Sequence, residues 1–248
     1  RPPLAKLQSP RYTFLMAAKN SVKEFVPDSY YHLYNRGVEK RTIFLDEQDR
    51  TVFLSYLKTY LLPKDEDALH AILVNSEKSS REKDQTLKLL RLNNFSETLT
   101  LLAYCLMPNH FHFLIKQKEA DTIDRFMNSL GTRYSTYFNR KYRRVGGLFQ
   151  GVYKAVRVTS GEQLLHLSRY IHRNPIVLAS QDHPLRSYTY SSYHQYLGLT
   201  HADWIHPEDI LGYFPKSQKR GIQEFVEGPS NGDGAIMIAK LVIDDDDS

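Results

Sequence analysis

Two kinds of hydrophobic pattern follow one another along the chain. In some segments apolar and polar residues alternate, which is typical of strands, and in others apolar residues recur every three or four positions, which is typical of helices. Strands are predicted over residues 30–34, 99–106, 110–117 and 148–158. Helices are predicted over residues 46–62, 122–140 and 159–174. The order strand–helix–strand–strand–helix–strand–helix predicts an α+β fold with an antiparallel sheet and helices packed on one face.

Changes in composition divide the chain around this predicted domain. Residues 1–25 are expected to be a leader or an N-terminal arm, and residues 26–180 to form the domain itself. Within the domain, the charged stretch 64–97 is expected to be a helical or flexible insert. Residues 181–228 are predicted to form a small helical C-terminal extension, and residues 229–248 a linker followed by an acidic tail.

Cysteine content and hydropathy exclude two classes of protein. The 248-residue chain has one cysteine, Cys105, so it can form neither an intrachain disulfide nor a CxxC zinc site. No apolar run approaches the ~18–20 residues that a membrane-spanning helix needs, and no signal peptide is recognisable. These features favour a protein of a reducing, cytoplasmic compartment with no membrane partner.

Positive charge is concentrated in one part of the chain. The net charge is +5, and between Arg125 and Arg173 the only acidic residue is Glu162, among many lysines and arginines. A basic block of this kind indicates a polyanionic partner, most often nucleic acid. A solvated helix face would explain the same charge, so charge alone leaves both interpretations open.

His110 and His112 carry the first candidate chemistry. They are separated by one residue in a predicted strand, so both imidazoles leave the same face, about 7 Å apart along the backbone. Two imidazoles on one face can hold a divalent cation, and such a cation can polarise a phosphate oxygen. The alternative is a pair of half-exposed sheet residues that bind nothing. His32, in the first predicted strand, is interpreted as a structural residue rather than a ligand.

Tyr170, in the third predicted helix, is the second residue with candidate chemistry. Helical spacing places it on the polar stripe rather than on the apolar one, with Asn174 one turn further, roughly 6 Å along the axis. A tyrosine oxygen can attack a phosphodiester, although its ordinary pKa near 10 means that it needs activation, for example by a nearby cation. Two histidines and an asparagine oxygen suit Mg²⁺ or Mn²⁺. Simple packing of Tyr170 is the alternative, and His166 and His172 beside it have no clear partner.

Several short segments, taken in order, carry a resemblance to a known family. They are Tyr31–Gly37, Tyr104–His112, Phe126–Leu130, Tyr137–Asn139, Gly147–Gly151, Tyr153–Ala155, Arg169–Pro175 and Tyr190–Tyr193. Together they resemble the single-tyrosine HUH transposases, and most closely the REP-associated tyrosine transposases. The chain departs from the family at Val152, where an arginine is common.

The resemblance implies a fold, a reaction and a substrate. The fold would be ferredoxin-like, with the HUH histidines on a central strand. Tyr170 would be the nucleophile, and His110, His112 and Asn174 would bind Mg²⁺ or Mn²⁺. The substrate would be single-stranded DNA, often beside a hairpin, and cleavage would leave a 5′-phosphotyrosine and a free 3′-OH without any nucleotide cofactor. The protein would be a bacterial transposase of the cytoplasm, bound to the nucleoid when on DNA, as a monomer or a homodimer.

Basic residues are expected to contact the phosphates of that DNA. They are Lys154, Arg157, Arg169, Arg173, Arg143, Arg144 and Arg36. Two alternatives to a transposase stay open. One is a domesticated protein that binds DNA hairpins without turnover, and the other is an HUH nickase of plasmid replication or conjugation.

Overall fold

The chain folds around a four-stranded antiparallel sheet. A computed structural model describes residues 25–178, 185–215 and 219–229. The strands are β1 (Ser29–Arg36), β2 (Leu99–Met107), β3 (His110–Gln117) and β4 (Lys154–Val158). The helices are α1 (Glu47–Leu61), α2 (Glu66–Val74), α3 (Ser80–Arg91), α4 (Thr122–Lys141), α5 (Gly161–Arg173), α6 (Tyr193–Tyr196), α7 (Glu208–Leu211) and α8 (Lys219–Glu227).

The connections between the strands are those of a ferredoxin-like fold. The strand order is β2-β3-β1-β4, with α1 in the connection from β1 to β2 and α4 in the connection from β3 to β4. The predicted α+β class is therefore confirmed, and β3, which carries His110 and His112, is an interior strand as expected. The fourth strand is shorter than predicted, because residues 148–153 form a loop in which Phe149 makes an isolated bridge to Gly37.

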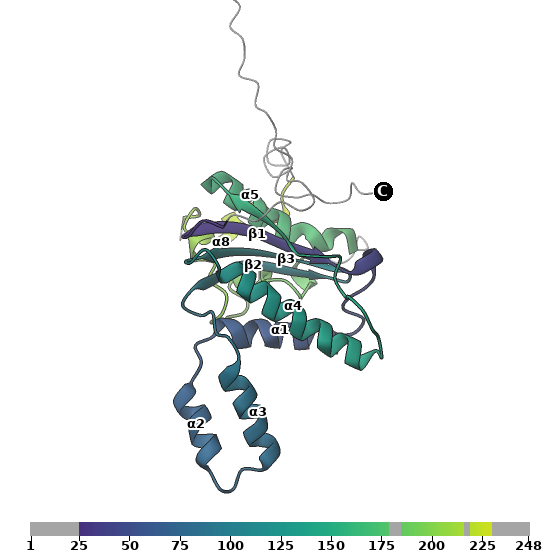
Figure 1. Cartoon of the computed structure of the whole chain (residues 1–248). Coiled ribbons are helices and arrows are strands. Elements are labelled where there is room, and N and C mark those ends of the chain that lie inside the picture. The colour runs from purple at the N-terminus through teal and green to yellow at the C-terminus, as the bar shows by residue number, and fades with distance from the viewer. Residues whose placement is uncertain (1–24, 179–184, 216–218, 230–248) are drawn as a thin grey trace, which may run out of the picture.

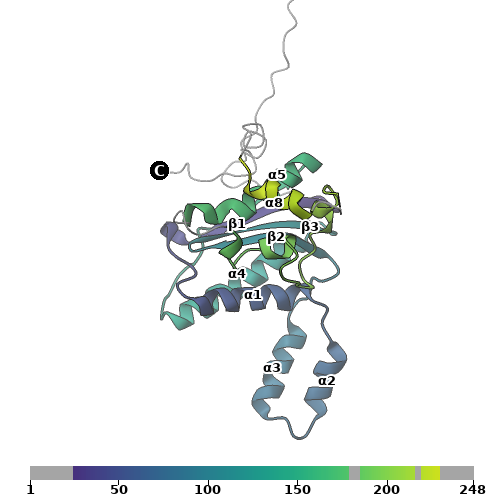
Figure 2. The ribbon, with the colours of Figure 1, turned by 180° about the vertical axis from the view of Figure 1, so that it is seen from behind.

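Helices cover both faces of the sheet, which corrects the expectation of one covered face. Helices α1 and α4 lie on one face, and α5 and α8 lie on the other (Figures 1 and 2). The reason is that β3 buries apolar side chains on both sides. Phe111 and Phe113 join the core under α1 and α4, whereas Leu114 joins a second core with Leu167 and Ile171 of α5. A strand buried on both faces needs a cover on each.

The insert and the C-terminal extension are both helical. Helices α2 and α3 form a hairpin that extends away from the sheet (Figure 1). At its base, Lys64 Nζ donates hydrogen bonds to the carbonyls of Leu90 and Leu92 at 2.9 and 2.7 Å, and Asn94 Nδ2 donates to the carbonyl of Leu62 at 2.6 Å. The extension packs back onto the sheet, with apolar residues of α6, α7 and α8 in the second core.

Both ends of the chain fall largely outside this description. The predicted N-terminal arm and the predicted linker and acidic tail lie outside the described residues, apart from Phe25 and Pro229. In the part of the chain that is described, no helix has the length and apolar character needed to cross a membrane.

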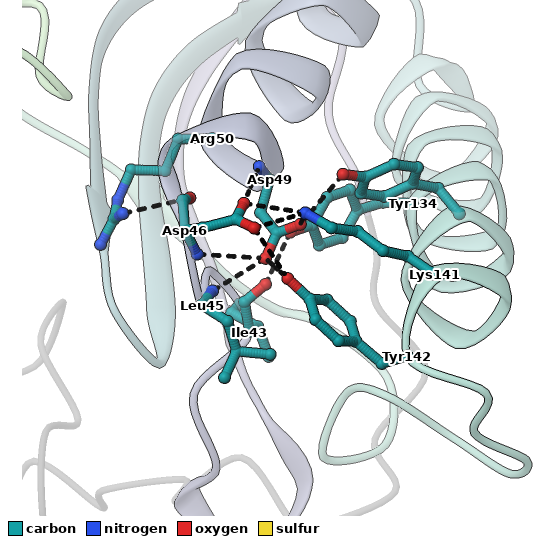
Figure 3. A network of polar contacts seen from close by, with 9 residues as sticks. Ile43, Leu45, Asp46, Asp49, Arg50, Tyr134, Lys141 and Tyr142 are labelled. Atoms are coloured by element: carbon teal, nitrogen blue, oxygen red, sulfur yellow. Dashed lines mark hydrogen bonds and ion pairs between the residues drawn. The ribbon is translucent and has the colours of Figure 1, made fainter.

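A cluster of polar side chains joins α1 to the end of α4 (Figure 3). Asp46 caps α1 by accepting from the backbone N–H of Asp49 at 2.9 Å. Asp49, which is 0% exposed, accepts from Lys141 Nζ at 2.8 Å, from Tyr142 OH at 2.8 Å and from the N–H of Leu45 at 2.8 Å. Both of its oxygens are therefore satisfied. We call this group the Asp49 cluster: Asp46, Asp49, Tyr137, Lys141 and Tyr142.

Candidate active site

The two histidines of β3 lie on the face of the sheet that α5 covers. Their ring centroids are 4.9 Å apart, with the ring planes nearly perpendicular. His112 is fully buried, whereas His110 is half-buried. His110 Nδ1 is 2.7 Å from Asn109 Oδ1, and its Nε2 is 3.5 Å from Asn174 Oδ1. The strand pattern thus correctly predicted that both imidazoles leave one face.

His32 of β1 determines how His112 is held. His32 Nε2 lies 2.9 Å from His112 Nδ1, so a single proton lies between these two nitrogens. Burial, followed by the neighbouring His32 and His110 rings, holds the pKa of His112 well below its usual range. A neutral His112 whose Nδ1–H donates to His32 would leave Nε2 with its lone pair, which is the form that binds a metal ion.

Tyr170 reaches this histidine pair from α5. The helix begins two residues after the predicted start, with Ser160 as its N-cap, because Ser160 Oγ accepts from the N–H of Gln163 at 3.1 Å. The Tyr170 ring meets His112 edge-on at 5.5 Å and His32 edge-on at 6.3 Å between centroids. The ring is half-buried and its hydroxyl is covered, so a phosphate can reach this oxygen only if the Tyr170 side chain turns or its cover moves.

Asn174 ends α5 and is oriented by the helix itself. Its Nδ2 donates to the carbonyl of Tyr170 at 3.1 Å, so its Oδ1 is left to face His110 Nε2. Two ligands of one Mg²⁺ ion at about 2.1 Å each lie roughly 3–4 Å apart, and the 3.5 Å between these two atoms falls in that range.

Two buried atoms at this site have no hydrogen-bond partner among the described residues. They are His112 Nε2 and the hydroxyl oxygen of Tyr170. Because buried polar atoms are almost always satisfied, such a pair calls for a ligand, an ion or water. No group of three or more His, Cys, Asp or Glu in the described ranges could hold a metal ion. Two imidazoles and an amide oxygen fit a divalent cation.

The basic residues predicted to bind phosphates do not all lie on this face. Arg36 pairs with His110 in the strand register, and Lys154 pairs with Tyr34, so the register places both side chains on the α5 side. Arg36 Nε also contacts Gln150 Oε1. Arg157 is exposed but pairs with Tyr31, whose side chain is in the core under α1 and α4. Arg157 is therefore on the opposite face from Tyr170.

Arg169 and Arg173 have structural partners. Arg169 is 7% exposed and donates to the carbonyls of Gly228 and Pro229 at 2.6 and 2.9 Å. Arg173 donates to the carbonyls of Val226 and Gly228 at 2.7 and 3.0 Å. These arginines hold the end of α8 against α5, so phosphate binding would have to compete with these bonds.

The remaining basic candidates lie in the loop after α4. Arg143 is exposed, with a positive φ of 51°, and Arg144 donates to Asn139 Oδ1 at 3.1 Å. Of the other histidines near Tyr170, His172 is buried and its Nε2 is 2.8 Å from Ser192 Oγ, while His166 packs against Phe225. Neither histidine has a described contact with the candidate site.

His32 is the site residue that sequence analysis undervalued. Its placement on the first strand was predicted, but its contact with His112 depends on the pairing of β1 with β3, which are 80 residues apart. The available signal was the alternation of residues 30–36, which puts His32 on one face with Tyr34 and Arg36. That pattern could not show which strand would lie beside it.

Comparison with known proteins shows what this part of the chain resembles. The family model described as "Transposase IS200 like" matches residues 69–174, a segment that contains His110, His112, Tyr170 and Asn174 but not β1 or α1. The resemblance to single-tyrosine transposases, seen first in the sequence motifs, is confirmed by this match. A comparison with curated protein sequences found no match.

Two solved structures are similar at a low level. One is a REP-associated tyrosine transposase bound to a REP hairpin, with 11% identity, a TM-score of 0.42, and coverage of 76% of this chain and 92% of that one. The other is tRNA(His) guanylyltransferase from Saccharomyces cerevisiae, with 11% identity, a TM-score of 0.28, and coverage of 85% and 81%. Likeness at this level assigns no function to the chain.

Proposed function

We propose that this protein cleaves and rejoins single-stranded DNA, with Tyr170 as the nucleophile and a divalent cation held by His110, His112 and Asn174. The observation that carries the proposal is the pair of buried, unpartnered atoms, His112 Nε2 and the Tyr170 hydroxyl, within one cluster of rings. A tyrosine that only packed would not need its hydroxyl buried without a hydrogen bond.

The chemistry is a phosphoryl transfer between two oxygens. The Tyr170 oxygen loses its proton and bonds to the phosphorus, while the bond from phosphorus to the 3′ oxygen breaks and that oxygen takes up a proton. The products are a 5′-phosphotyrosine and a free 3′-OH, and attack by a 3′-OH reverses the reaction. A Mg²⁺ or Mn²⁺ ion, when bound, would polarise a phosphate oxygen and favour the phenolate.

The chain's own residues would supply position and charge. His32 would keep the His112 ring in place through the 2.9 Å contact, and the helix would keep the Asn174 oxygen toward His110. Lys154 and Arg36, on the same side of the sheet, would bind the phosphates that flank the cleaved bond.

Replacement of the nucleophile tests the proposal. The substrate is a single strand, with or without an adjoining hairpin. The proposed reaction leaves the fragment on the 3′ side of the cleaved bond attached to the protein, so the DNA is labelled at its 3′ end. With Mn²⁺, the wild type should give a denaturant-stable protein–DNA adduct, and Tyr170→Phe should give none. Tyr213→Phe, the same change at an exposed tyrosine, is the matched control and should give the wild-type yield. An undiminished adduct with Tyr170→Phe would remove Tyr170 from the reaction.

The same assay separates the two alternative functions. A domesticated hairpin-binding protein would retain the labelled hairpin but form no adduct with any metal. A replication or conjugation nickase would form the adduct on an origin sequence in preference to a repeat with a hairpin. The oligomeric state, the bacterial cytoplasmic location and the recognition of a hairpin stay predictions.

A further inference from the structure

A second basic surface lies on the other side of the sheet, between α1 and α4. It is a groove of about 650 Å³, which we call the Arg133 groove. Its lining combines cationic and aromatic side chains: Tyr56, Arg133, Thr136, Tyr137, Arg140 and Lys141. Grooves of this composition suit a nucleic-acid strand, because cations pair with its phosphates and aromatic rings stack on its bases.

The cationic side chains of this groove differ in whether they already form salt bridges. Lys141 is bound to Asp46 and Asp49 at 2.7 and 2.8 Å, so the Asp49 cluster neutralises it. Arg133 and Arg140 form no salt bridge with any described residue. Two arginines with no carboxylate partner beside a concave surface favour an anionic ligand.

Arg133 is also held ready for such a ligand. Its guanidinium carbon lies 3.8 Å from the ring centroid of Tyr56 and 5.7 Å from that of Tyr60, so cation–π contacts restrict its position. Its Nη1 is buried and has no hydrogen-bond partner among the described residues. A phosphate oxygen could satisfy this donor after a small shift of the side chain, whereas an apolar ligand could not.

A basic path connects this groove to the candidate active site. Arg36, beside His110 in the strand register, contacts Gln150 in the loop that follows α4. That loop folds back on the helix end, because the N–H of Arg144 donates to the carbonyl of Asn139 at 2.8 Å. Arg143 is exposed on this loop and Arg140 on the helix next to it. The chain has no acidic residue between positions 125 and 161.

We infer that the DNA segment flanking the cleaved phosphodiester passes over the loop after α4 and binds with its phosphates in the Arg133 groove. This inference rests on the proposed function, because it assumes that the cleaved phosphodiester of the DNA lies at Tyr170. The groove would hold the strand without reading its sequence, since phosphate contacts position a nucleic acid but do not specify bases.

The test measures how salt weakens binding of a short and a long oligonucleotide to the full chain in EDTA. Each lost phosphate contact reduces the log–log salt slope for a single strand by about 0.7. The Arg133→Met/Arg140→Gln variant should therefore reduce the slope by about 1.4 for the long strand and leave the short strand unchanged. Arg140→Gln alone changes an exposed side chain and should reduce the slope by about 0.7 even if the double variant folds poorly.

Arg125→Gln is the matched control, because Arg125 lies on the same helix but outside the groove lining, paired with Asp121 at 3.4 Å. It should leave both slopes at the wild-type value. Equal slopes for wild type and both groove variants on the long strand would overturn the inference, as would an equal loss on the short strand.

Adduct formation is followed on the same preparations with Mn²⁺. An adduct in all of them with unchanged slopes refutes only the groove, whereas no adduct in the wild type refutes the proposed function.

Discussion

Two clusters of buried polar side chains, one on each face of the sheet, differ in whether their polar atoms have hydrogen-bond partners. In the Asp49 cluster each carboxylate oxygen of the buried Asp49 has hydrogen-bond donors, from Lys141, Tyr142, Tyr137 and a backbone N–H. In the candidate active site, His112 Nε2 and the Tyr170 hydroxyl have no hydrogen-bond partner among the described residues. The first arrangement stabilises the fold, whereas the second contains two buried polar atoms whose hydrogen-bonding capacity an external ligand could satisfy.

The largest effect on stability is expected at Asp49. Asp49→Ala removes a buried carboxylate and leaves Lys141, Tyr137 and Tyr142 without their shared acceptor. We expect the free energy of unfolding to fall by about 3 kcal/mol, the lower end for breaking a buried pair, since Lys141 is partly exposed and keeps Asp46. Urea unfolding measures this. A change below about 1 kcal/mol would show that the cluster is not a major stabilising element.

The next effect concerns metal binding rather than stability. His32→Leu removes the partner of His112 Nδ1, and loss of such a partner commonly weakens metal binding by about 10–100-fold. Titration with Mn²⁺, followed by electron paramagnetic resonance, measures the affinity without any DNA. His201→Leu, at an exposed histidine of the extension, should leave the affinity unchanged. Equal affinities for His32→Leu and wild type would mean that His32 does not orient a ligand.

A smaller effect on stability, which depends on pH, is expected at Tyr142 of the Asp49 cluster. Burial, then the hydrogen bond to Asp49, raises the pKa of Tyr142 to about 12. Between about pH 10 and 12 the unfolded chain loses this phenol proton while the folded chain keeps it, so folding stability falls as pH rises through this range. Tyr142→Phe should cost about 1 kcal/mol at pH 7 and progressively less above pH 10. A constant difference between the two proteins from pH 7 to 11 would contradict the assignment.

The smallest effect is expected where the polar atom has no partner. Tyr170→Phe removes a buried hydroxyl without breaking any described hydrogen bond, so the free energy of unfolding should change by less than about 0.5 kcal/mol, or rise slightly. Asp49→Ala and Tyr170→Phe should therefore change the free energy of unfolding by clearly different amounts. A loss of more than about 1 kcal/mol at Tyr170 would show that its hydroxyl makes a stabilising contact, and the comparison between the two clusters would fail.

Local patterns predicted more of this protein than long-range contacts did. Alternation in residues 110–117 predicted a strand with both histidines on one face, and helical spacing predicted that Asn174 would lie one turn beyond Tyr170. Both predictions depend only on neighbours in the chain. The assignment of Tyr170, His110, His112 and Asn174 to catalysis stays a prediction, although the structure brings all four together.

Features that depend on pairing between distant segments were not predictable. The contact of His32 with His112 follows from the register of β1 on β3, and a shift of one residue would have turned His32 to the other face. Arg169 and Arg173 were expected on DNA, but the carbonyls at the end of α8, more than 50 residues away, are their partners in this structure. A basic residue's sequence position does not show whether a folded chain already uses its donors.

The hairpin of α2 and α3 has a consequence for how this protein can change over evolutionary time. Lys64 and Asn94 tie the two ends of the insert together at its base, close to where α1 ends and β2 begins. Such a tied junction separates the arm from the sheet, since additional helical turns would lengthen the arm without altering the spacing of its two attachment points. The arm could therefore change in length while Tyr170, His110 and His112 keep their relative positions.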